Sequence, residues 1–425
     1  MPSKIVSLPS LSIFWYCSSN KKFWEVIIIK FEHKMRGNVA FGVNPIGCKQ
    51  DVKNQINYVK EQGSYQGPKR VLIIGASSSY GLATRISLAF GAGADTIGVS
   101  FEKEPKSEKN LGTAGWYNNI YFKQAAEAEG LVAKNFVQDA FSHETKQDVI
   151  NYIKDEWDGK IDLVVYSLAS SVRVDPDTGE RFNSVIKSIG ETVKGPHVNI
   201  QKQEYFDHVL EPATEEEIAD TVKVMGGEDW QLWMEALKEA DVLEDGVLTV
   251  NYSYLGSKLN RPYYGGGTLG QAKADCEVKA ENINELLTDI NGKATIVVAT
   301  AVTTKASSVI PFFPVYCLGL YRVMVDNGTH ETPIMHQDRI YRDMLYGENS
   351  EYDDKGRLRP DSWELDPLVQ AATEALINQI NEDNFNSNFT GYSTFIKEFN
   401  NLSGFDIDGY EEEEVTLEEL IALEY

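Results

Sequence analysis

The sequence of 425 residues predicts an α/β fold with a doubly wound parallel sheet. The first observation is a series of short, continuously apolar runs separated by segments with a helical pattern. Strands of this kind are buried on both faces, which is typical of a parallel sheet sandwiched between helices. The five runs are VLIIGA at 71–76, TIGVSF at 96–101, LVAKNFV at 131–137, LVVYSLA at 163–169 and ATIVVATAV at 294–302.

The second observation is a glycine turn that follows the first run directly, in GASSSYGLATRISLAF. A strand that leads into a glycine turn and then a helix is the context of a nucleotide site. Glycine lets the backbone approach a pyrophosphate, and the helix start stabilises its charge. Gly75 and Gly81 have five residues between them, which differs from the usual GxGxxG spacing. On spacing alone, a tight turn without a ligand is about equally consistent.

An acidic residue at the end of the second run supports a nucleotide site. Glu102 follows Phe101 at the position where a carboxylate accepts hydrogen bonds from the ribose of adenosine. A carboxylate there repels the additional phosphate of NADP and so favours NADH, although Lys103 follows directly and weakens this preference. Asp139–Ala140 and Leu168–Ala169 follow the third and fourth runs, at strand ends where ligands of such sheets bind. Together these positions predict the path of a dinucleotide.

A long excursion separates the fourth apolar run from the last one. It is predicted to be a helical insert that covers the substrate, over about residues 171–250. Thr214 and Glu217 have the spacing of a capping box, and a helix from Trp230 carries its large apolar residues on one face. Beyond the last run the chain is expected to be helical, with Asp366 as a helix cap.

No internal repeat or low-complexity linker divides the chain. We therefore expect a single domain over residues 27–410, with a nucleotide-binding core over about 70–305. Residues 1–26 form an N-terminal extension of unknown status, which resembles a signal peptide only faintly. Residues 411–425 are predicted to be an acidic, solvated tail that ends in a short helix capped by Thr416.

Composition excludes several classes of function. The chain has 40 Lys and Arg against 64 Asp and Glu, and the net charge of −24 argues against nucleic acid as a partner. The four cysteines form no CxxC pair and the six histidines form no HExxH motif, so neither a disulfide framework nor a metal site is predicted. The apolar run at 308–321 is too short to span a membrane and is expected to be a core helix or pocket wall.

The stretch RPYYGGGTLGQAK contains a candidate catalytic pair. If Tyr264 and Lys273 were on one helix, they would lie on opposite faces, because they are nine residues apart and each helical residue turns by about 100°. The glycines at 265–267 disfavour a helix, so we expect Tyr264 on a loop before a helix that starts near Thr268. Lys273 would then reach back and lower the pKa of the tyrosine as a nearby cation. Tyr263 is expected to pack or line the pocket.

These residues and the surrounding motifs resemble the trans-2-enoyl-CoA reductases and FabV-type enoyl-acyl carrier protein reductases. Besides Tyr-x8-Lys, the motifs are VLIIGASSSYGLATR, GVSFEK, GTAGWYN, DLVVYSLAS, YSYLG, ASSVIP and GRLRPDSWE, in the same order across about residues 27–410. The resemblance implies a Rossmann fold like that of short-chain dehydrogenases/reductases, with a helical insertion and extra C-terminal helices. It also implies a generally monomeric, NADH-dependent enzyme that reduces the double bond of an enoyl thioester.

The resemblance implies a role for each matching residue. Tyr264 and Lys273 match the catalytic pair, and Tyr254 matches a tyrosine assigned to the substrate. Ser79 stands where the family usually has glycine, so a left-handed backbone there would strain the serine and weaken cofactor binding. The matching NAD contacts are Gly75, Ala76, Ser77, Ser78, Ser79, Tyr80, Phe101, Glu102, Asp139, Ala140, Leu168, Ala169, Lys273, Val302, Thr303 and Thr304.

The leading hypothesis is hydride transfer from NADH to the β-carbon of a 2-enoyl thioester in fatty acid synthesis. Tyr264 would hydrogen-bond the enolate oxygen, and the sequence leaves open whether Tyr264 or Tyr254 delivers the proton. Two alternatives are a carbonyl reductase or alcohol dehydrogenase with the same pair, and a non-catalytic NAD-binding sensor. Because enoyl-CoA and enoyl-acyl carrier protein are anionic, we expect a basic patch at the pocket mouth. A cytoplasmic location is expected, and the N-terminal extension leaves organelle targeting open.

Overall fold

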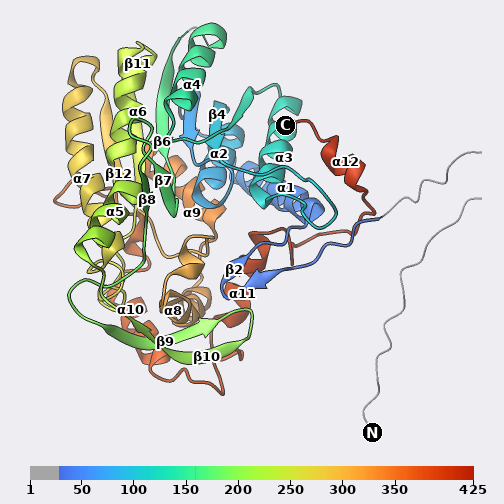
Figure 1. Cartoon of the computed structure of the whole chain (residues 1–425), viewed down its shortest axis with the longest axis vertical. Coiled ribbons are helices and arrows are strands. Elements are labelled where there is room, and N and C mark those ends of the chain that lie inside the picture. The colour runs from blue at the N-terminus through green and yellow to red at the C-terminus, as the bar shows by residue number, and fades with distance from the viewer. Residues whose placement is uncertain (1–27, 158) are drawn as a thin grey trace, which may run out of the picture.

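A six-stranded parallel sheet forms the centre of the computed structural model, which describes residues 28–157 and 159–425 (Figure 1). The strand order is β12-β11-β6-β3-β4-β5, so the chain starts in the middle and winds outward in both directions. The predicted doubly wound α/β fold is confirmed, whereas the extension at 1–26 lies outside the described residues. The strands are β3 (Arg70–Ile74), β4 (Asp95–Ser100), β5 (Ala133–Val137), β6 (Ile161–Tyr166), β11 (Leu243–Ser253) and β12 (Lys293–Val298).

Alternate side chains of each strand face opposite layers of helices, because successive residues of a strand point to opposite faces. Leu72 and Ile74 pack with α4, α6 and α7, whereas Val71 and Ile73 pack with α2 and the π-helical turn at 340–345. On the second face, α1 forms an outer layer on α2 and α3. The helices are α1 (Pro45–Glu61), α2 (Ser79–Ala92), α3 (Ala114–Ala128), α4 (His143–Glu156), α6 (Glu228–Glu239), α7 (Thr268–Leu286) and α9 (Pro333–Arg339).

The strand β11 corrects the predicted extent of the insert. It pairs in parallel with both β6 and β12, so the chain has already returned to the sheet at Leu243. The insert predicted over about 171–250 is therefore too long. Helix α6 does not cover a substrate, since Trp230 and Trp233 are fully buried in the core against the sheet. The predicted apolar face of this helix is confirmed.

Two β-hairpins and a helix make up most of the remaining excursion. The hairpin β9–β10 packs on α8, in the lower part of Figure 1. Helix α5 packs against β8 and α7 and begins with the predicted capping box of Thr214 and Glu217. The bounds are β7 (Val172–Val174), β8 (Arg181–Asn183), β9 (Val193–Asn199), β10 (Glu204–Leu210) and α5 (Glu215–Met225), and an earlier hairpin joins β1 (Met35–Arg36) to β2 (Val39–Ala40).

The residues after β12 are mainly helical, as predicted. Helix α8 occupies the apolar run and is a core helix, because its side chains fill a second hydrophobic cluster with α10 and α11. The carboxylate of Asp366 accepts hydrogen bonds from the first amides of α10, which confirms it as the cap. Leu358 adds one bridge to the edge of the sheet, where its amide donates to Ile296 of β12 at 2.9 Å. The bounds are α8 (Phe313–Asn327), α10 (Pro367–Ile377) and α11 (Tyr392–Asn401).

The acidic C-terminal end docks on the body of the protein. Its acidic side chains at 411–414 are exposed, as predicted, and Thr416 caps the short helix α12 (Leu417–Ile421). However, Leu420 is buried and the ring of Tyr425 stacks on Trp116 of α3 at 4.3 Å between centroids. The prediction of a solvated tail therefore holds for the carboxylates and is wrong for the apolar residues that follow them.

Within the described residues, no group of three or more His, Cys, Asp or Glu side chains could hold a metal ion. The cysteines of this part of the chain, Cys48, Cys276 and Cys317, are free and buried. His336 is fully buried and hydrogen-bonded in the core, in agreement with a structural role. No described helix is both long enough and apolar enough to cross a membrane.

Candidate active site

Tyr264 lies on a tight turn immediately before helix α7, as predicted. The helix begins at Thr268 with Gly267 as its N-cap, and the amide of Gly267 donates to the carbonyl oxygen of Tyr264 at 3.0 Å. Lys273 lies in the second turn of the helix. Its Nζ donates to the carbonyl oxygen of Tyr252 in β11 at 2.9 Å. The helix therefore places this ammonium at the carboxyl end of the sheet, near the turn that carries Tyr264.

Burial controls the proton affinity of Tyr264. The side chain is 7% exposed, and burial raises its pKa above the usual value of about 10. The predicted lowering of this pKa by Lys273 is therefore wrong in this structure, because the ammonium is directed at the Tyr252 carbonyl. With a raised pKa, Tyr264 stays protonated near neutral pH and is suited to donate a hydrogen bond.

The hydroxyl groups of Tyr254 and Tyr264 have different partners, although the two rings touch edge to face at 5.0 Å between centroids. The hydroxyl of Tyr254 donates to Glu364 Oε1 at 2.7 Å and accepts a hydrogen bond from Asn260 Nδ2 at 2.6 Å. In contrast, the hydroxyl of Tyr264 has no hydrogen-bond partner within the described residues. Tyr263 is buried and donates to Asn260, which confirms its packing role. Tyr264 is therefore the tyrosine whose proton is free to reach a ligand.

Glu364 is a functional candidate that the sequence reasoning missed. Its buried carboxylate accepts hydrogen bonds from the hydroxyls of Tyr254 and Tyr316, both at 2.7 Å. The hydroxyl of Thr300 and the amide of Ala301 donate to the other oxygen, at 2.9 and 2.6 Å. Burial raises the pKa of Glu364, and these four donors oppose that shift because they stabilise the charged form. The only sequence signal was its place at the end of the GRLRPDSWE motif.

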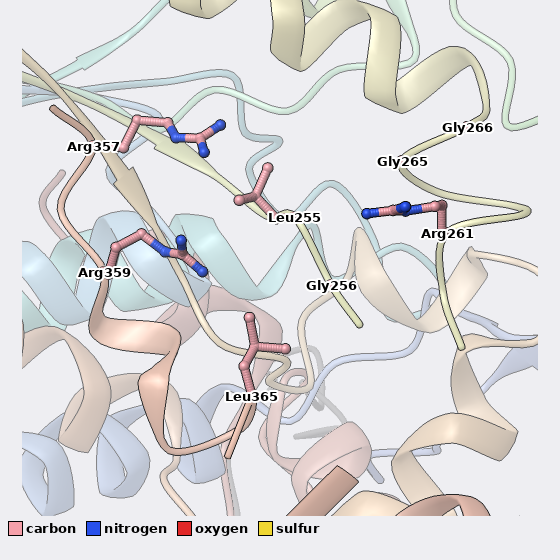
Figure 2. Close-up of a pocket in the computed structure, with 8 residues that line it drawn as sticks. All are labelled: Leu255, Gly256, Arg261, Gly265, Gly266, Arg357, Arg359 and Leu365. Atoms are coloured by element: carbon pink, nitrogen blue, oxygen red, sulfur yellow. The ribbon is translucent and has the colours of Figure 1, made fainter. Parts of the chain in front are cut away.

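A pocket of about 660 Å³ opens beside the glycine turn of Tyr264 (Figure 2). The guanidinium groups of Arg357 and Arg359 point into it from one side, and that of Arg261 points in from the other. The pocket is lined by Leu255, Gly256, Arg261, Gly265, Gly266, Arg357, Arg359 and Leu365. No carboxylate is part of this lining, although Arg357 and Arg359 are paired with Glu277, Asp353 and Asp361 beside it.

The predicted ribose-binding carboxylate of Glu102 follows β4 and is held in place by two hydroxyl groups. Ser77 Oγ of the glycine turn donates to Glu102 Oε1 at 2.5 Å, and Thr113 donates to Oε2. Phe101 beside it is 75% exposed and leaves its ring free for a ligand. The glycine turn, Phe101 and Glu102 therefore lie together at the carboxyl ends of β3 and β4, which fits an adenosine site.

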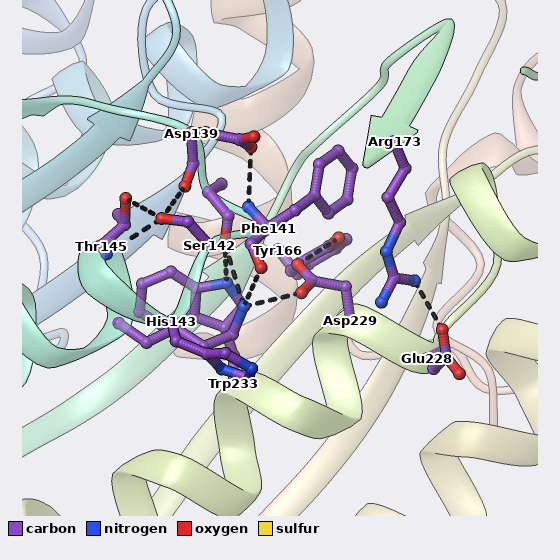
Figure 3. Close-up of polar contacts among 12 residues, drawn as sticks. Asp139, Phe141, Ser142, His143, Thr145, Tyr166, Arg173, Glu228, Asp229 and Trp233 are labelled. Atoms are coloured by element: carbon purple, nitrogen blue, oxygen red, sulfur yellow. Dashed lines mark hydrogen bonds and ion pairs between the residues drawn. The ribbon is translucent and has the colours of Figure 1, made fainter. Parts of the chain in front are cut away.

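The loop of Asp139 and Ala140 after β5 is anchored to α4 and α6 (Figure 3). Lys146 Nζ donates to the carbonyl of Ala140 at 3.1 Å, and Trp233 Nε1 donates to the same oxygen at 3.1 Å. Lys146 also forms a buried ion pair with Asp229 at 2.8 Å. Burial raises the pKa of Asp229, and Lys146 partly offsets this shift. The ion pair therefore fixes a loop that the resemblance assigns to the cofactor.

The loop after β12, which contains Val302, Thr303 and Thr304, closes over the carboxyl edge of the sheet. Its position is set through Thr300, whose carbonyl accepts from Tyr80 at 2.8 Å and whose amide donates to His336 Nε2 at 3.1 Å. The predicted cofactor residue Tyr80 thus links the start of α2 to this loop. Leu168 and Ala169 follow β6 after Ser167, and β6 lies between β3 and β11 in the sheet.

Ser79, which stands where the family usually has glycine, adopts the left-handed backbone conformation that would strain a serine. Its φ is 51°, whereas the preceding Ser78 is extended with φ of −159°. A left-handed conformation costs about 1–2 kcal/mol for a residue with a side chain. The condition for strain at this position is therefore met.

The fold and the nucleotide site define the class of the protein as a nicotinamide-dependent oxidoreductase. A family model described as the trans-2-enoyl-CoA reductase catalytic region matches residues 110–346. The NAD(P)H binding domain of trans-2-enoyl-CoA reductase matches residues 30–107. The chain therefore belongs to the trans-2-enoyl-CoA reductase family.

Similar proteins cover nearly the whole chain. A trans-2-enoyl-CoA reductase [NADH] of Clostridium beijerinckii is 48% identical over 93% of this chain and 99% of its own length. An enoyl-[acyl-carrier-protein] reductase [NADH] of Photobacterium profundum is 47% identical over 89% of this chain and 95% of its own. The crystal structure of the Clostridium acetobutylicum trans-2-enoyl-CoA reductase with NADH has a TM-score of 0.90 at 47% identity, and covers 94% of this chain and 100% of that one.

A third family model, described as an enoyl reductase FAD binding domain, matches residues 352–414. The residues of this segment do not fit a dinucleotide such as FAD. They form α10, α11 and a 3-10 turn, with no strand that leads through a glycine turn into a helix. The carboxylate of Glu364, from the same segment, is already fully hydrogen-bonded to the tyrosine site. The segment therefore supports the tyrosine site and does not have the features of a second nucleotide site.

Substitutions at Ser79 are expected to reveal the left-handed strain. Ser79→Gly should be more stable than Ser79→Ala by about 1 kcal/mol, because glycine avoids the steric cost and loses only part of this gain as unfolded-state entropy. At the extended Ser78 the order should reverse, with Ser78→Ala more stable than Ser78→Gly. The apparent free energy of unfolding in denaturant measures all four variants. If Ser79→Ala were at least as stable as Ser79→Gly, Ser79 would carry no such strain.

The buried ion pair should be costly to break from one side. Asp229→Asn leaves the Lys146 ammonium buried without a counter-charge and is expected to lower the free energy of unfolding by about 3–5 kcal/mol. The double variant Lys146→Met/Asp229→Leu should lose less than this single variant. Asp241→Asn is the control, since its pair with Lys160 is exposed and should contribute little to stability. Equal losses for both Asp→Asn variants would refute the anchoring role.

Proposed function

We propose that this protein reduces the carbon–carbon double bond of trans-2-enoyl thioesters with NADH. The observation that carries the proposal is the unpaired, protonated hydroxyl of Tyr264 beside the carboxyl edge of a nucleotide-binding sheet. Membership of the trans-2-enoyl-CoA reductase family supports the substrate class. In the balanced reaction, an enoyl thioester, NADH and a proton give the saturated acyl thioester and NAD+.

NADH, when bound, supplies the hydride that adds to the β-carbon of the enoyl group. As that bond forms, negative charge develops on the thioester oxygen as an enolate. Tyr264 donates its O–H to this oxygen, and its raised pKa keeps the donor neutral while it stabilises the charge. The α-carbon then takes up a proton, and the enolate returns to a carbonyl.

Lys273 is proposed to bind the ribose of the cofactor. Its ammonium lies at the end of β11, where it donates to the Tyr252 carbonyl, and it has further donors for ribose hydroxyls. In this role Lys273 orients the nicotinamide ribose and adds positive charge near the developing enolate. This role replaces the predicted lowering of the tyrosine pKa.

Tyr254 is proposed to shape the substrate site. Its hydroxyl is held between Glu364 and Asn260, so its ring stands against Tyr264 and limits where the enoyl chain can lie. To protonate substrate, Tyr254 would have to release Glu364. We therefore assign hydrogen bonding of the thioester oxygen to Tyr264, and positioning of the substrate to Tyr254.

The wider biological role rests on the relatives. They include both enoyl-CoA and enoyl-acyl carrier protein reductases, which supports an anionic thioester carrier for this chain as well. Glu102 at the ribose position supports NADH over NADPH. The family resemblance supports a monomeric, cytoplasmic enzyme of fatty acid synthesis.

Substitution of the two tyrosines separates their roles. With crotonyl-CoA and NADH, Tyr264→Phe should lower kcat by about 10²–10³, the usual loss for one donor to an oxyanion. Tyr254→Phe should act mainly on KM, and Lys273→Ala should raise the KM for NADH and lower kcat. Spectrophotometric NADH oxidation measures each effect, and Tyr58→Phe, on the outer helix α1, is the control.

Two results would contradict this assignment. Near wild-type turnover of both Tyr264→Phe and Lys273→Ala would exclude them as the catalytic pair. Reduction of ketones or aldehydes by the wild-type protein, without reduction of enoyl thioesters, would favour a carbonyl reductase. NADH binding without oxidation on any of these substrates would favour a sensor.

The pH profile tests the protonation state of Tyr264. Because its folded pKa is raised, the neutral donor form is fully present below the usual tyrosine pKa of about 10 and is lost only as pH rises through the folded value. Between about pH 6 and pH 9, kcat should therefore show no step that belongs to Tyr264. A fall in kcat with an apparent pKa of about 7–8 that disappears in Tyr264→Phe would show instead that Lys273 lowers the tyrosine pKa.

A further inference from the structure

We propose that the arginine-lined pocket binds the phosphate end of the pantetheine arm of the substrate carrier, with Arg261 as its phosphate contact. This inference rests on the proposed function and specifies how the anionic part of the thioester is recognised. A phosphate ester on pantetheine is the chemistry that coenzyme A and acyl carrier protein share.

The position of the pocket suits the arm of a thioester that is reduced at Tyr264. Gly265 and Gly266, directly after Tyr264, line one wall, and Leu255, directly after Tyr254, lines another. The pocket has a volume of about 660 Å³, which is within the usual range for small-ligand sites. The lining of the pocket therefore begins one residue after each of the two tyrosines.

The pocket also lies on the correct side of the sheet. Leu255 follows β11, and Leu358, between Arg357 and Arg359, bridges to the edge strand β12. The adenosine residues Glu102 and Asp139 follow β4 and β5, at the opposite edge. NADH and the carrier would thus approach the tyrosines from opposite ends of the sheet and would not compete for space.

The guanidinium of Arg261 is available to a ligand, whereas those of Arg357 and Arg359 are already paired. Arg357 is paired with Glu277 and Asp353, and Arg359 is paired with Asp361 and Asp353. Arg261 is exposed, and its guanidinium has no hydrogen-bond or ion-pair partner within the described residues. Its guanidinium points into the pocket toward the paired arginines (Figure 2). An unpaired guanidinium with planar donors matches a phosphate group, which it can bind with two parallel hydrogen bonds.

The backbone of the glycine turn adds a second recognition element. The amide of Gly265 has no hydrogen-bond partner in the described part of the chain. A Cβ built on Gly265 would meet only the Leu255 carbonyl oxygen, at 3.7 Å, so the wall is open backbone. This unpaired amide is a donor for a polar group of the pantetheine arm.

The electrostatic setting explains why such a pocket is needed. The chain has a net charge of −24, and its overall field repels an anionic carrier. Arg357 and Arg359 are paired with carboxylates just outside the lining, so the guanidinium of Arg261 supplies the uncompensated positive charge of the pocket. The predicted basic patch at the pocket mouth thus has a candidate location at Arg261.

The test compares crotonyl-CoA with crotonyl-pantetheine, which has the same acyl group and arm but no phosphate. Arg261→Ala should raise the KM for crotonyl-CoA about tenfold, with kcat changed by less than about twofold, and should change the KM for crotonyl-pantetheine by less than about twofold. Arg261→Lys should retain part of the affinity because it keeps the charge. Lys258→Ala is the matched control: it removes a cation from the same loop, where Lys258 pairs with Glu374 outside the pocket lining.

A comparison of crotonyl-acyl carrier protein with crotonyl-CoA distinguishes two sources of the phosphate. If Arg261→Ala also raises the KM for crotonyl-acyl carrier protein, the contact is the phosphate adjacent to pantetheine. If it affects crotonyl-CoA alone, the contact is a phosphate of the nucleotide end of coenzyme A. The first result supports the proposal, whereas the second would move the contact from the pantetheine phosphate to the nucleotide end of coenzyme A and contradict it. Equal changes in KM for crotonyl-CoA and crotonyl-pantetheine, or no change for any substrate, would overturn it.

A binding measurement separates this inference from the proposed function. Titration calorimetry of coenzyme A with the wild-type protein and Arg261→Ala should show about a tenfold weaker Kd for the variant. If the wild-type protein oxidised NADH with none of the thioesters, the proposed reaction would be wrong, while the calorimetric difference would still support a phosphate site. An unchanged Kd for coenzyme A would overturn the site even in an active enzyme.

Discussion

The buried carboxylate of Glu364 is the interaction on which the geometry of the candidate active site depends. It accepts hydrogen bonds from Tyr254 after β11, from Thr300 and Ala301 after β12, and from Tyr316 of α8. An ionised carboxylate has acceptor sites for all four donors, and each donor stabilises its charge in this buried site. The C-terminal helical region is therefore coupled to the sheet by a group that cannot be removed without leaving several buried donors unpaired.

The glycine turn supplies the second constraint, because it separates the tyrosine from the helix that carries the lysine. A Cβ on Gly267 would lie 2.6 Å from the Lys187 carbonyl oxygen, and one on Gly270 would lie 2.1 Å from that of Gly265. These close approaches let the turn fold directly onto the first residues of α7. The long spacing between Tyr264 and Lys273 is therefore compatible with one compact site, and the same bare backbone forms a wall of the neighbouring pocket.

The parts of the fold that could be predicted were those with a regular pattern. Continuous apolar runs identified five of the strands in the parallel sheet, and the glycines placed Tyr264 before a helix start at Thr268. Strand β11 was missed because its buried residues include Thr249, Asn251 and Ser253, so it is not a continuous apolar run. It also begins with an irregular register against β6.

The site residues that could not be predicted depend on contacts between distant segments. Glu364 follows Tyr254 by more than a hundred residues, and no local spacing connects a carboxylate in a loop to a tyrosine at a strand end. Similarly, the net charge of the chain gives no indication that Arg261 is unpaired while Arg357 and Arg359 are neutralised. Such pairing is a property of three-dimensional packing, which a single sequence does not contain.

Hydrogen-bond partners also explain why Tyr254 and Tyr264, whose rings are in contact, can have different roles. A phenol has one proton to donate, and Tyr254 donates it to Glu364 while its oxygen accepts from Asn260. If Tyr254 turned to a substrate, a buried carboxylate would lose a donor, at a cost of about 1–3 kcal/mol. Tyr264 has no such partner to lose, so its full interaction with a developing enolate would contribute to catalysis. The proposed division of labour therefore follows from what each hydroxyl already binds, since the two side chains are chemically identical.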